Sequence, residues 1–125
     1  MQASHDAIVI GAGQAGPYLA VRLAQAGLKV ALVEREHFGG TCVNDGCIPT
    51  KTLVASARTA FVARRAADYG VRIEGEVRVD MKAVKARKDG VVRQSSDGLA
   101  AWIAGMKNVT LLWGQARFTG PRTLD

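Results

Sequence analysis

The segment of residues 7–34 constrains the fold of this chain more than any other. An apolar run over 7–10 enters a glycine-rich turn, a helix-like stretch covers 14–26, and a second apolar run over 29–33 ends at an acidic residue. The apolar runs have the length and composition of buried strands, and apolar residues recur at helical spacing in the stretch between them. A strand, a glycine turn, a helix and a second strand in this order predict an α/β fold with a parallel sheet.

The glycine turn has the pattern G-x-G-x-x-G, and each glycine in it has a physical role. Gly11 allows a tight turn, Gly13 lets the backbone approach a pyrophosphate, and Gly16 lets the helix pack closely on the strand. Glu34 follows about 20 positions later, where an acidic side chain can accept hydrogen bonds from ribose hydroxyls. Such a glycine pattern alone is often an ordinary turn, and an acid after a strand is often simply solvated. The complete order of elements favours a dinucleotide site.

The two cysteines of the chain, Cys42 and Cys47, are separated by four residues, among glycines and ahead of a helical pattern. The first turn of a helix carries partial positive charge and unpaired N–H groups, which favour a thiolate over a thiol. Four intervening residues can bend far enough to close a disulfide. The spacing alone leaves two interpretations open, a redox-active dithiol and two unpaired, buried cysteines. The dinucleotide pattern upstream favours the dithiol.

The turn GAGQAG together with the segment GGTCVNDGCIPTK resembles the N-terminus of the pyridine nucleotide-disulfide oxidoreductases, which include glutathione reductase, dihydrolipoamide dehydrogenase and mercuric reductase. The second segment is long, ordered and specific, and residues 113–118 are similar to the family's G-x-A-x-F strand. The resemblance implies a Rossmann-like FAD-binding domain. It also implies that electrons pass from NAD(P)H through FAD to the cysteine pair and then to a substrate.

Carried over by position, the resemblance implies a set of cofactor-binding residues. Gly11, Gly13 and Gly16 would receive the FAD pyrophosphate, and Glu34 would hold the adenosine ribose. The remaining implied contacts are those of Gly40, Thr41 and Cys42 on the flavin side, Lys51 beside the flavin, and the backbone of Gly114 and Ala116 at the adenine end.

The resemblance also implies unequal catalytic roles. Cys42 would be the interchange thiol that attacks substrate, and Cys47 would face the isoalloxazine ring and form the charge-transfer thiolate. Lys51 would lie by the flavin and pair with a glutamate from farther along the chain. Outside the resemblance, Lys51 is an ordinary helix lysine that reaches into solvent. No resident metal ion is expected.

The length of 125 residues is short for this family, whose polypeptides contain several domains. One G-x-G-x-x-G is present, so we expect residues 1–125 to be the N-terminal portion of a truncated FAD-binding domain, with the NAD(P)H-binding and dimerisation domains absent. The full-length parent is expected to be a homodimer. The fragment alone is expected to be inactive, because the fold that binds the hydride donor is missing.

Composition and charge narrow the partners and the compartment. No apolar run approaches the roughly 18 to 20 residues that a membrane helix needs, and a cysteine pair in a reductase-like motif fits a reducing cytoplasm. The net charge of +6 suggests nucleic-acid binding through the basic stretch 82–93, but acidic residues interrupt that stretch and no aromatic residues alternate with it. A solvated helix face is therefore favoured. We expect a small-molecule substrate, no nucleic acid and no membrane.

The predicted function is that of an FAD-dependent oxidoreductase that passes electrons from NAD(P)H to a disulfide or to mercuric ion. The segment 45–56 is most similar to mercuric-reductase-like members, which we favour on that ground. Dihydrolipoamide dehydrogenase and glutathione reductase-type activities are the alternatives. An inactive FAD-binding fragment, or a module whose two thiols bind soft metal ions, is the alternative of another class.

The rest of the chain gives a coarser pattern. We expect a redox helix from about 42 to 69, a short strand over 71–73, and a helix over 81–106 that is weakened near residues 95–98. Two final strands are expected over 108–113 and 115–119.

Overall fold

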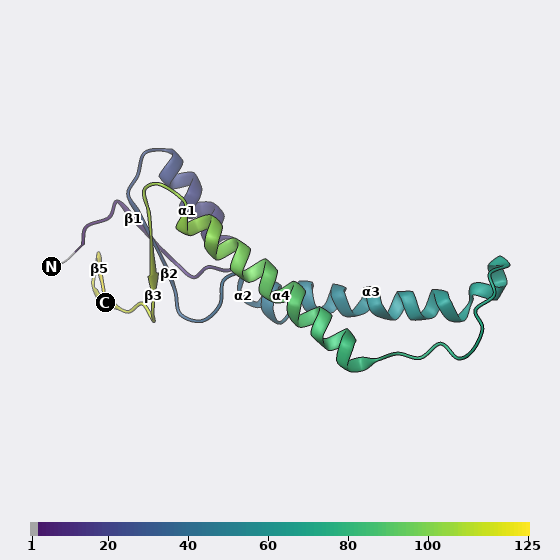
Figure 1. The fold of residues 1–125 in the computed structure, drawn as a ribbon. Coiled ribbons are helices and arrows are strands. Elements are labelled where there is room, and N and C mark those ends of the chain that lie inside the picture. Colours follow the sequence, from purple (N-terminus) through teal and green to yellow (C-terminus); the bar gives the residue numbers. More distant parts are fainter. Residues whose placement is uncertain (1–2) are drawn as a thin grey trace.

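The computed structural model describes residues 3–125. A small sheet lies at one end of the molecule, and a long helical hairpin projects from it (Figure 1). In chain order the elements are β1 (Ala7–Ile10), α1 (Gly16–Gln25), β2 (Val30–Glu34), α2 (Gly40–Asn44), α3 (Cys47–Arg64), the 3-10 helix η1 (Ala66–Tyr69), α4 (Met81–Ala104), β3 (Val109–Trp113), β4 (Phe118–Gly120) and β5 (Thr123–Leu124).

The main sheet has three strands in the order β1-β2-β3, and both pairs of neighbours are parallel. Val9, Leu32 and Leu111 lie side by side across it. All five residues of the central strand β2 are buried between β1 and β3, as expected for a central strand of a parallel sheet. The predicted α/β fold with a parallel sheet is therefore confirmed.

The hydrophobic core lies between the sheet, α1 and the C-terminal part of α4. Helix α1 contributes Ala20, Val21 and Ala24, which pack against β1 and β2, and α4 contributes Ile103, which is fully buried. Pro17 lies in the first turn of α1, where its missing N–H costs no intrahelical hydrogen bond. The small alanines let α1 approach the sheet closely, and the short connection from β1 places the first turn of α1 at the carboxyl ends of the strands.

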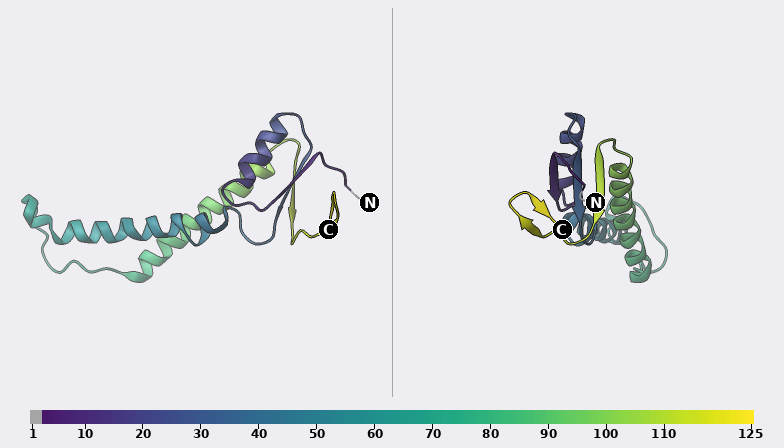
Figure 2. Two further views of the ribbon diagram at one scale, coloured as in Figure 1. Left: turned by 180° about the vertical axis from the view of Figure 1, so that it is seen from behind. Right: turned by 90° about the vertical axis from the view of Figure 1, so that its left-hand side faces the viewer.

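The β4–β5 hairpin lies on the other side of the sheet from α4 (Figure 2). A cavity of about 340 Å³ separates this hairpin from the sheet, and its apolar lining includes Ile8, Ala31, Leu112 and Leu124. The side chain of Ile8 remains 41% exposed. This face of the sheet is therefore only partly covered.

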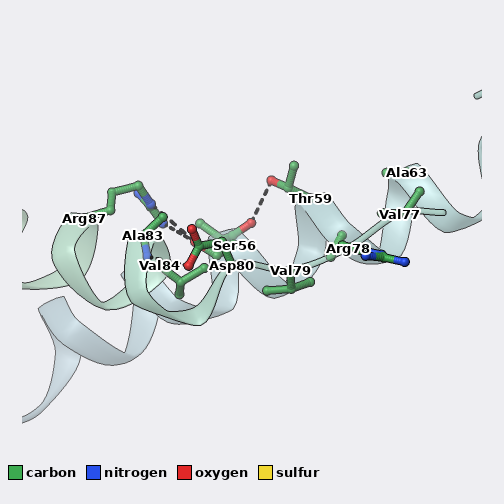
Figure 3. Close-up of a pocket in the computed structure, with 12 residues that line it drawn as sticks. Ser56, Thr59, Ala63, Val77, Arg78, Val79, Asp80, Ala83, Val84 and Arg87 are labelled. Atoms are coloured by element: carbon green, nitrogen blue, oxygen red, sulfur yellow. Dashed lines mark hydrogen bonds between the residues drawn. The ribbon is translucent and has the colours of Figure 1, made fainter. Parts of the chain in front are cut away.

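Helix α4 runs back along α3 to form the projecting hairpin (Figure 1). Arg87 of α4 joins the two helices, because its guanidinium donates to the backbone carbonyl of Thr52 and, at 2.8 Å, to the hydroxyl of Ser56. A hollow of about 530 Å³ lies between α3, the extended segment before α4 and the first turns of α4. Figure 3 shows residues that line it. Asp80 begins α4 by accepting hydrogen bonds from the N–H groups of Lys82 and Ala83.

None of the helices formed by residues 3–125 combines the length and the apolar composition that a membrane-spanning helix requires.

The basic stretch of the sequence forms the first half of α4. Lys85 Nζ lies 2.5 Å from Asp89 Oδ2, and Lys88 pairs with the other oxygen of the same carboxylate. The hydrogen bonds from Lys85 and then Lys88 lower the pKa of Asp89 to about 2. Asp89 therefore stays ionised and offsets part of the positive charge on this helix face.

The structure divides the predicted redox helix over 42–69 into α2, α3 and η1. The first break lies at Gly46, whose φ of −120° and ψ of −109° are not helical. A Cβ at this position would lie 3.0 Å from the carbonyl oxygen of Thr41, so the close turn favours a glycine here. As a result the two cysteines belong to two different helices.

Three further expectations about secondary structure were wrong. Residues 71–73 form no strand, and the chain is irregular from there until α4 begins. Helix α4 continues without a break through 95–98, where the Ser95 hydroxyl donates to the Val91 carbonyl one turn earlier. The strand expected over 115–119 is the shorter β4, which pairs with β5 and not with the main sheet.

Truncation of Ile103 tests the position of the core. Ile103→Ala should lower the free energy of unfolding by about 2 to 5 kcal/mol, because it leaves a cavity among fully buried side chains. Ile73→Ala is the matched control, since this isoleucine is 50% exposed outside the core. Urea unfolding followed by circular dichroism measures both variants, and equal losses of stability would contradict this placement of the core.

Candidate functional site

The glycine turn connects β1 to α1 at the carboxyl edge of the sheet. The Gly11 N–H donates to the Val33 carbonyl at 2.7 Å, which continues the β1–β2 pairing by one residue. A Cβ on Gly16 would lie 1.9 Å from the Gly11 carbonyl oxygen, so a larger residue cannot occupy this position without moving the backbone. A Cβ on Gly13 would meet no atom within 4 Å. The turn is therefore tight between Gly11 and Gly16 and open beside Gly13, where a pyrophosphate has room to lie.

Glu34 ends β2 with its carboxylate directed at the glycine turn. Oε2 accepts a hydrogen bond from the N–H of Ala12 at 2.7 Å, and Oε1 accepts from Arg35 and Glu36 at 2.8 and 2.7 Å. The residue is only 8% exposed. Burial raises the pKa of Glu34, but hydrogen bonds from the backbone N–H groups of Glu36, Ala12, Arg35 and His37 together outweigh it and lower the pKa overall. The ionised carboxylate therefore joins the glycine turn to β2.

A cavity of about 220 Å³ opens beside this carboxylate. The Gly114 N–H donates to the Glu34 carbonyl at 2.9 Å, and the Arg35 guanidinium donates to the Gln115 side chain at 3.0 Å, so the end of β3 is fixed next to the end of β2. Four residues that the sequence pointed to separately line this one cavity: Gly11, Glu34, Gly114 and Ala116.

The loop after β2 brings a second pair of glycines against the first turn. The Gly39 N–H donates to the Ala12 carbonyl at 2.7 Å, and the Gln14 side chain donates to the Gly39 carbonyl at 3.3 Å. A Cβ on Gly40 would lie 3.0 Å from Cα of Gly13. These contacts place α2, which begins at Gly40, directly beside the open part of the glycine turn.

The two cysteines interact where α2 meets α3. Cys42 is half-buried in α2 and Cys47 is exposed at the first residue of α3, and both are free thiols. The hydrogen bond with the Cys47 side chain raises the pKa of the Cys42 thiol, and burial and charge repulsion from Cys47 add to this effect. The Cys47 backbone and the positive charge of Lys51 act in the opposite direction. The net effect is upward, so Cys42 keeps its proton at neutral pH.

The surroundings of the two sulfur atoms differ. Cys47 occupies the N-terminus of an 18-residue helix, where the backbone dipoles attract negative charge. Lys51 lies one turn later on α3 and is exposed. Thr41 is exposed at the start of α2, and its carbonyl accepts from the Asp45 N–H at 2.9 Å. Within residues 3–125 no group of three or more His, Cys, Asp or Glu side chains is placed to hold a metal ion.

Two side chains that the sequence did not single out also support this region. Asn44 and Ser96 both donate to the carbonyl of Phe38, at 3.0 and 2.9 Å. Ser96 is 58 positions from Phe38 and reaches it from α4. No local sequence pattern signals such a contact, because it depends on where α4 crosses the loop.

The chain belongs to the pyridine nucleotide-disulphide oxidoreductase family, whose model matches residues 5–124. It is 42% identical over 121 residues to dihydrolipoyl dehydrogenase of Rhizobium etli, and 44% identical over 122 residues to that of Thermus scotoductus. These matches cover 97% and 98% of this chain but 25% and 26% of the two relatives. The chain therefore spans about a quarter of their length.

A solved structure agrees with this assignment. The Cu(II) complex of the HOCl-induced flavoprotein disulfide reductase RclA from Escherichia coli matches with a TM-score of 0.80 and 36% identity, over 98% of this chain and 24% of that one. The Rossmann-like fold and the family resemblance are confirmed. These relatives give no support to the preference for a mercuric-reductase-like member. They do support the alternative, dihydrolipoamide dehydrogenase.

Replacement of the buried carboxylate should change the acid stability of the protein. The pKa of Glu34 is lowered in the folded state, so its stabilisation is complete above the ordinary value of 4.5 and is lost as the pH falls through the lower folded value. Glu34→Gln should cost about 2 kcal/mol at pH 7, the scale of a hydrogen bond to a charged group. It should also flatten the loss of stability between neutral and acid pH.

Urea unfolding at a series of pH values between neutral and acid measures this effect. Glu36→Gln is the control, because Glu36 is exposed and forms only a long ion pair with Arg35. Parallel pH profiles for the wild type and Glu34→Gln would contradict the structural role of this carboxylate.

Alanine substitutions distinguish a required glycine from a replaceable one. Gly16→Ala should lower the free energy of unfolding by about 1 to 3 kcal/mol, because the new methyl group collides with the Gly11 carbonyl oxygen. Gly98→Ala on α4 meets no atom within 4 Å and should be neutral or stabilising, since alanine favours a helix more than glycine does. The same urea titration measures both variants, and an equal response would show that the turn is not as tight as described.

Proposed function

We propose that this chain is the first part of the FAD-binding domain of a longer reductase, in which Cys42 and Cys47 carry electrons between the cofactor and a disulfide or dithiol substrate. The proposal rests on one arrangement: the glycine turn and the cavity beside Glu34 share the carboxyl edge of the sheet, and the Gly39–Gly40 contacts place α2, which holds Cys42, next to the turn. Cys42 in turn interacts with Cys47. Domains for NAD(P)H binding and dimerisation belong to the part of the parent beyond this chain.

The residues present fit FAD. The open side of Gly13 and the adjoining Gly40 would accommodate the pyrophosphate, and the N-terminus of α1 would face its negative charge. Oε2 of Glu34 accepts one hydrogen bond from Ala12 and has a second lone pair for a ribose hydroxyl. The cavity bounded by Glu34, Gly114 and Ala116 would take the adenine end. When bound, FAD would supply a two-electron carrier between a nicotinamide and the cysteines.

The cysteine pair would perform the exchange with substrate. The Cys42 sulfur attacks one sulfur of a substrate disulfide, forms a mixed disulfide and releases the first substrate thiol. Cys47 then attacks Cys42, which closes the internal disulfide and releases the second thiol. Because contact with Cys47 raises the pKa of Cys42, the first attack needs a proton acceptor, which we place in the parent outside this chain. Lys51 would lie by the flavin, and Thr41 would line the flavin side of the site.

The preferred substrate is a dihydrolipoyl-type dithiol, which the same exchange oxidises in reverse. Support comes from the relatives, which are dihydrolipoyl dehydrogenases. A metal ion as electron acceptor is the second candidate, because the similar RclA structure is a Cu(II) complex. We further propose that the parent is a homodimer in a reducing cytoplasm, where a cysteine pair is available for catalysis.

Serine variants of the full-length protein test the proposed roles. Two-electron reduction of the wild type without oxygen should produce a long-wavelength thiolate-to-flavin absorption band. Cys47→Ser should abolish that band, whereas Cys42→Ser should keep it and lose at least a hundredfold of substrate turnover, since the attacking sulfur is gone. Loss of the band in Cys42→Ser would reverse the two roles.

Turnover with dihydrolipoamide and NAD⁺, measured beside NADPH-dependent reduction of mercuric and cupric ions, separates the substrate candidates in the same experiment. A wild-type protein that retains no flavin would refute the proposal as a whole.

A further inference from the structure

The segment Phe38–Gly40 connects the nucleotide unit to the cysteine pair, and two of its three residues are glycines. Gly39 and Gly40 both have positive φ, at +89° and +55°. Glycine adopts negative φ as readily as positive φ, so hydrogen bonds with other residues help to select this conformation. Helix α2 and Cys42 follow directly, so any movement of this segment moves the first cysteine.

Each carbonyl of this segment accepts a hydrogen bond from a side chain. The Asn44 amide donates to the carbonyls of Phe38 and Gly40, at 3.0 and 2.9 Å. Ser96 donates a second hydrogen bond to Phe38 at 2.9 Å, and Gln14 donates to Gly39 at 3.3 Å. Three separate parts of the chain therefore converge on three consecutive carbonyls.

Asn44 occupies a special place in this arrangement because it lies between the two cysteines. Both hydrogens of its amide are used on the segment that precedes Cys42. Asn44 is also the last residue of α2, just before the break at Gly46 that leads to Cys47. One side chain thus joins the backbone on both sides of Cys42, and it does so next to the point where the chain changes direction.

We propose that Asn44 is a positioning residue for the cysteine pair, and that Ser96 of α4 assists it through their shared acceptor, the Phe38 carbonyl. The amide holds α2 against the Phe38–Gly40 segment, so that Cys42 stays at the distance from Cys47 from which a disulfide closes. This inference rests on the proposed redox function of the pair. It concerns the spacing of the two sulfur atoms and not their contact with the cofactor.

The consequence is measurable as an equilibrium. Oxidised glutathione converts the two thiols into a disulfide and releases two molecules of reduced glutathione, so the equilibrium constant reports how readily the two sulfur atoms meet. Asn44→Leu keeps a branched side chain of similar shape but removes both donors. In the full-length protein it should reduce this constant about fivefold, the effect of roughly one net hydrogen bond. Ser96→Ala should shift it in the same direction by a smaller factor.

Ser95→Ala is the matched control, because the Ser95 hydroxyl donates to the Val91 carbonyl within its own helix and not to the loop. It should leave the equilibrium constant unchanged. The measurement is differential alkylation of the peptide that contains both cysteines, after equilibration in glutathione buffers, together with the melting temperature of each variant. A role in stability alone would lower the melting temperature without moving the redox equilibrium.

A wild-type equilibrium constant in both Asn44→Leu and Ser96→Ala, or an equal shift in Ser95→Ala and Ser96→Ala, overturns the inference. If Asn44→Leu does not fold, Ser96→Ala against Ser95→Ala decides the question alone. The readout needs no flavin, so failure of the wild type to retain FAD would refute the proposed cofactor while the test of Asn44 stands.

Discussion

The hydrogen bond from the Ala12 N–H to the Glu34 carboxylate is the interaction on which the rest of this site depends. The carboxylate accepts a backbone hydrogen bond from Ala12 in the glycine turn, while N–H groups of the residues that follow it hold it at the end of β2. Because the turn lies where β1 meets α1, this anion adds a side-chain link between the turn and β2 to the backbone pairing of β1 with β2. The Gly39 loop then packs on the same turn through Ala12, and α2 follows from it. The buried Glu34 carboxylate is therefore linked to the helix that holds Cys42 through Ala12 and Gly39.

The nucleotide unit could be predicted from the sequence because its signals are local. Strand-length apolar runs, a glycine pattern and a following acid each act over a few residues, and β1, α1 and β2 form close to where they were expected. The division of the redox helix was missed, since the break lies in the non-helical φ and ψ of Gly46, which the residue type alone does not reveal. The support from Ser96 was missed for another reason: it joins positions far apart, and only the packing of α4 reveals it.

Predicting what the site residues touch was harder than predicting which residues form the site. Glu34, Gly114 and Ala116 do meet at one cavity, as a shared cofactor would require. The sequence suggested a carboxylate facing a ligand, yet the structure shows it bound largely to its own backbone, with capacity left on one oxygen. The resemblance to a family implied unequal roles for the two cysteines, which stay a prediction, and the structure places the two residues in different helices.

The projecting hairpin of α3 and α4 has a consequence for motion. Away from the sheet the hairpin buries few side chains. Toward its tip Phe61, Val62 and Tyr69 are each at least half exposed. A region with so little burial can open locally while the sheet stays folded. Amide hydrogens near the tip should then exchange with solvent far sooner than those of β2. The two ends of α3 thus differ in burial, and Cys47 lies at the end that packs against α2 and α4.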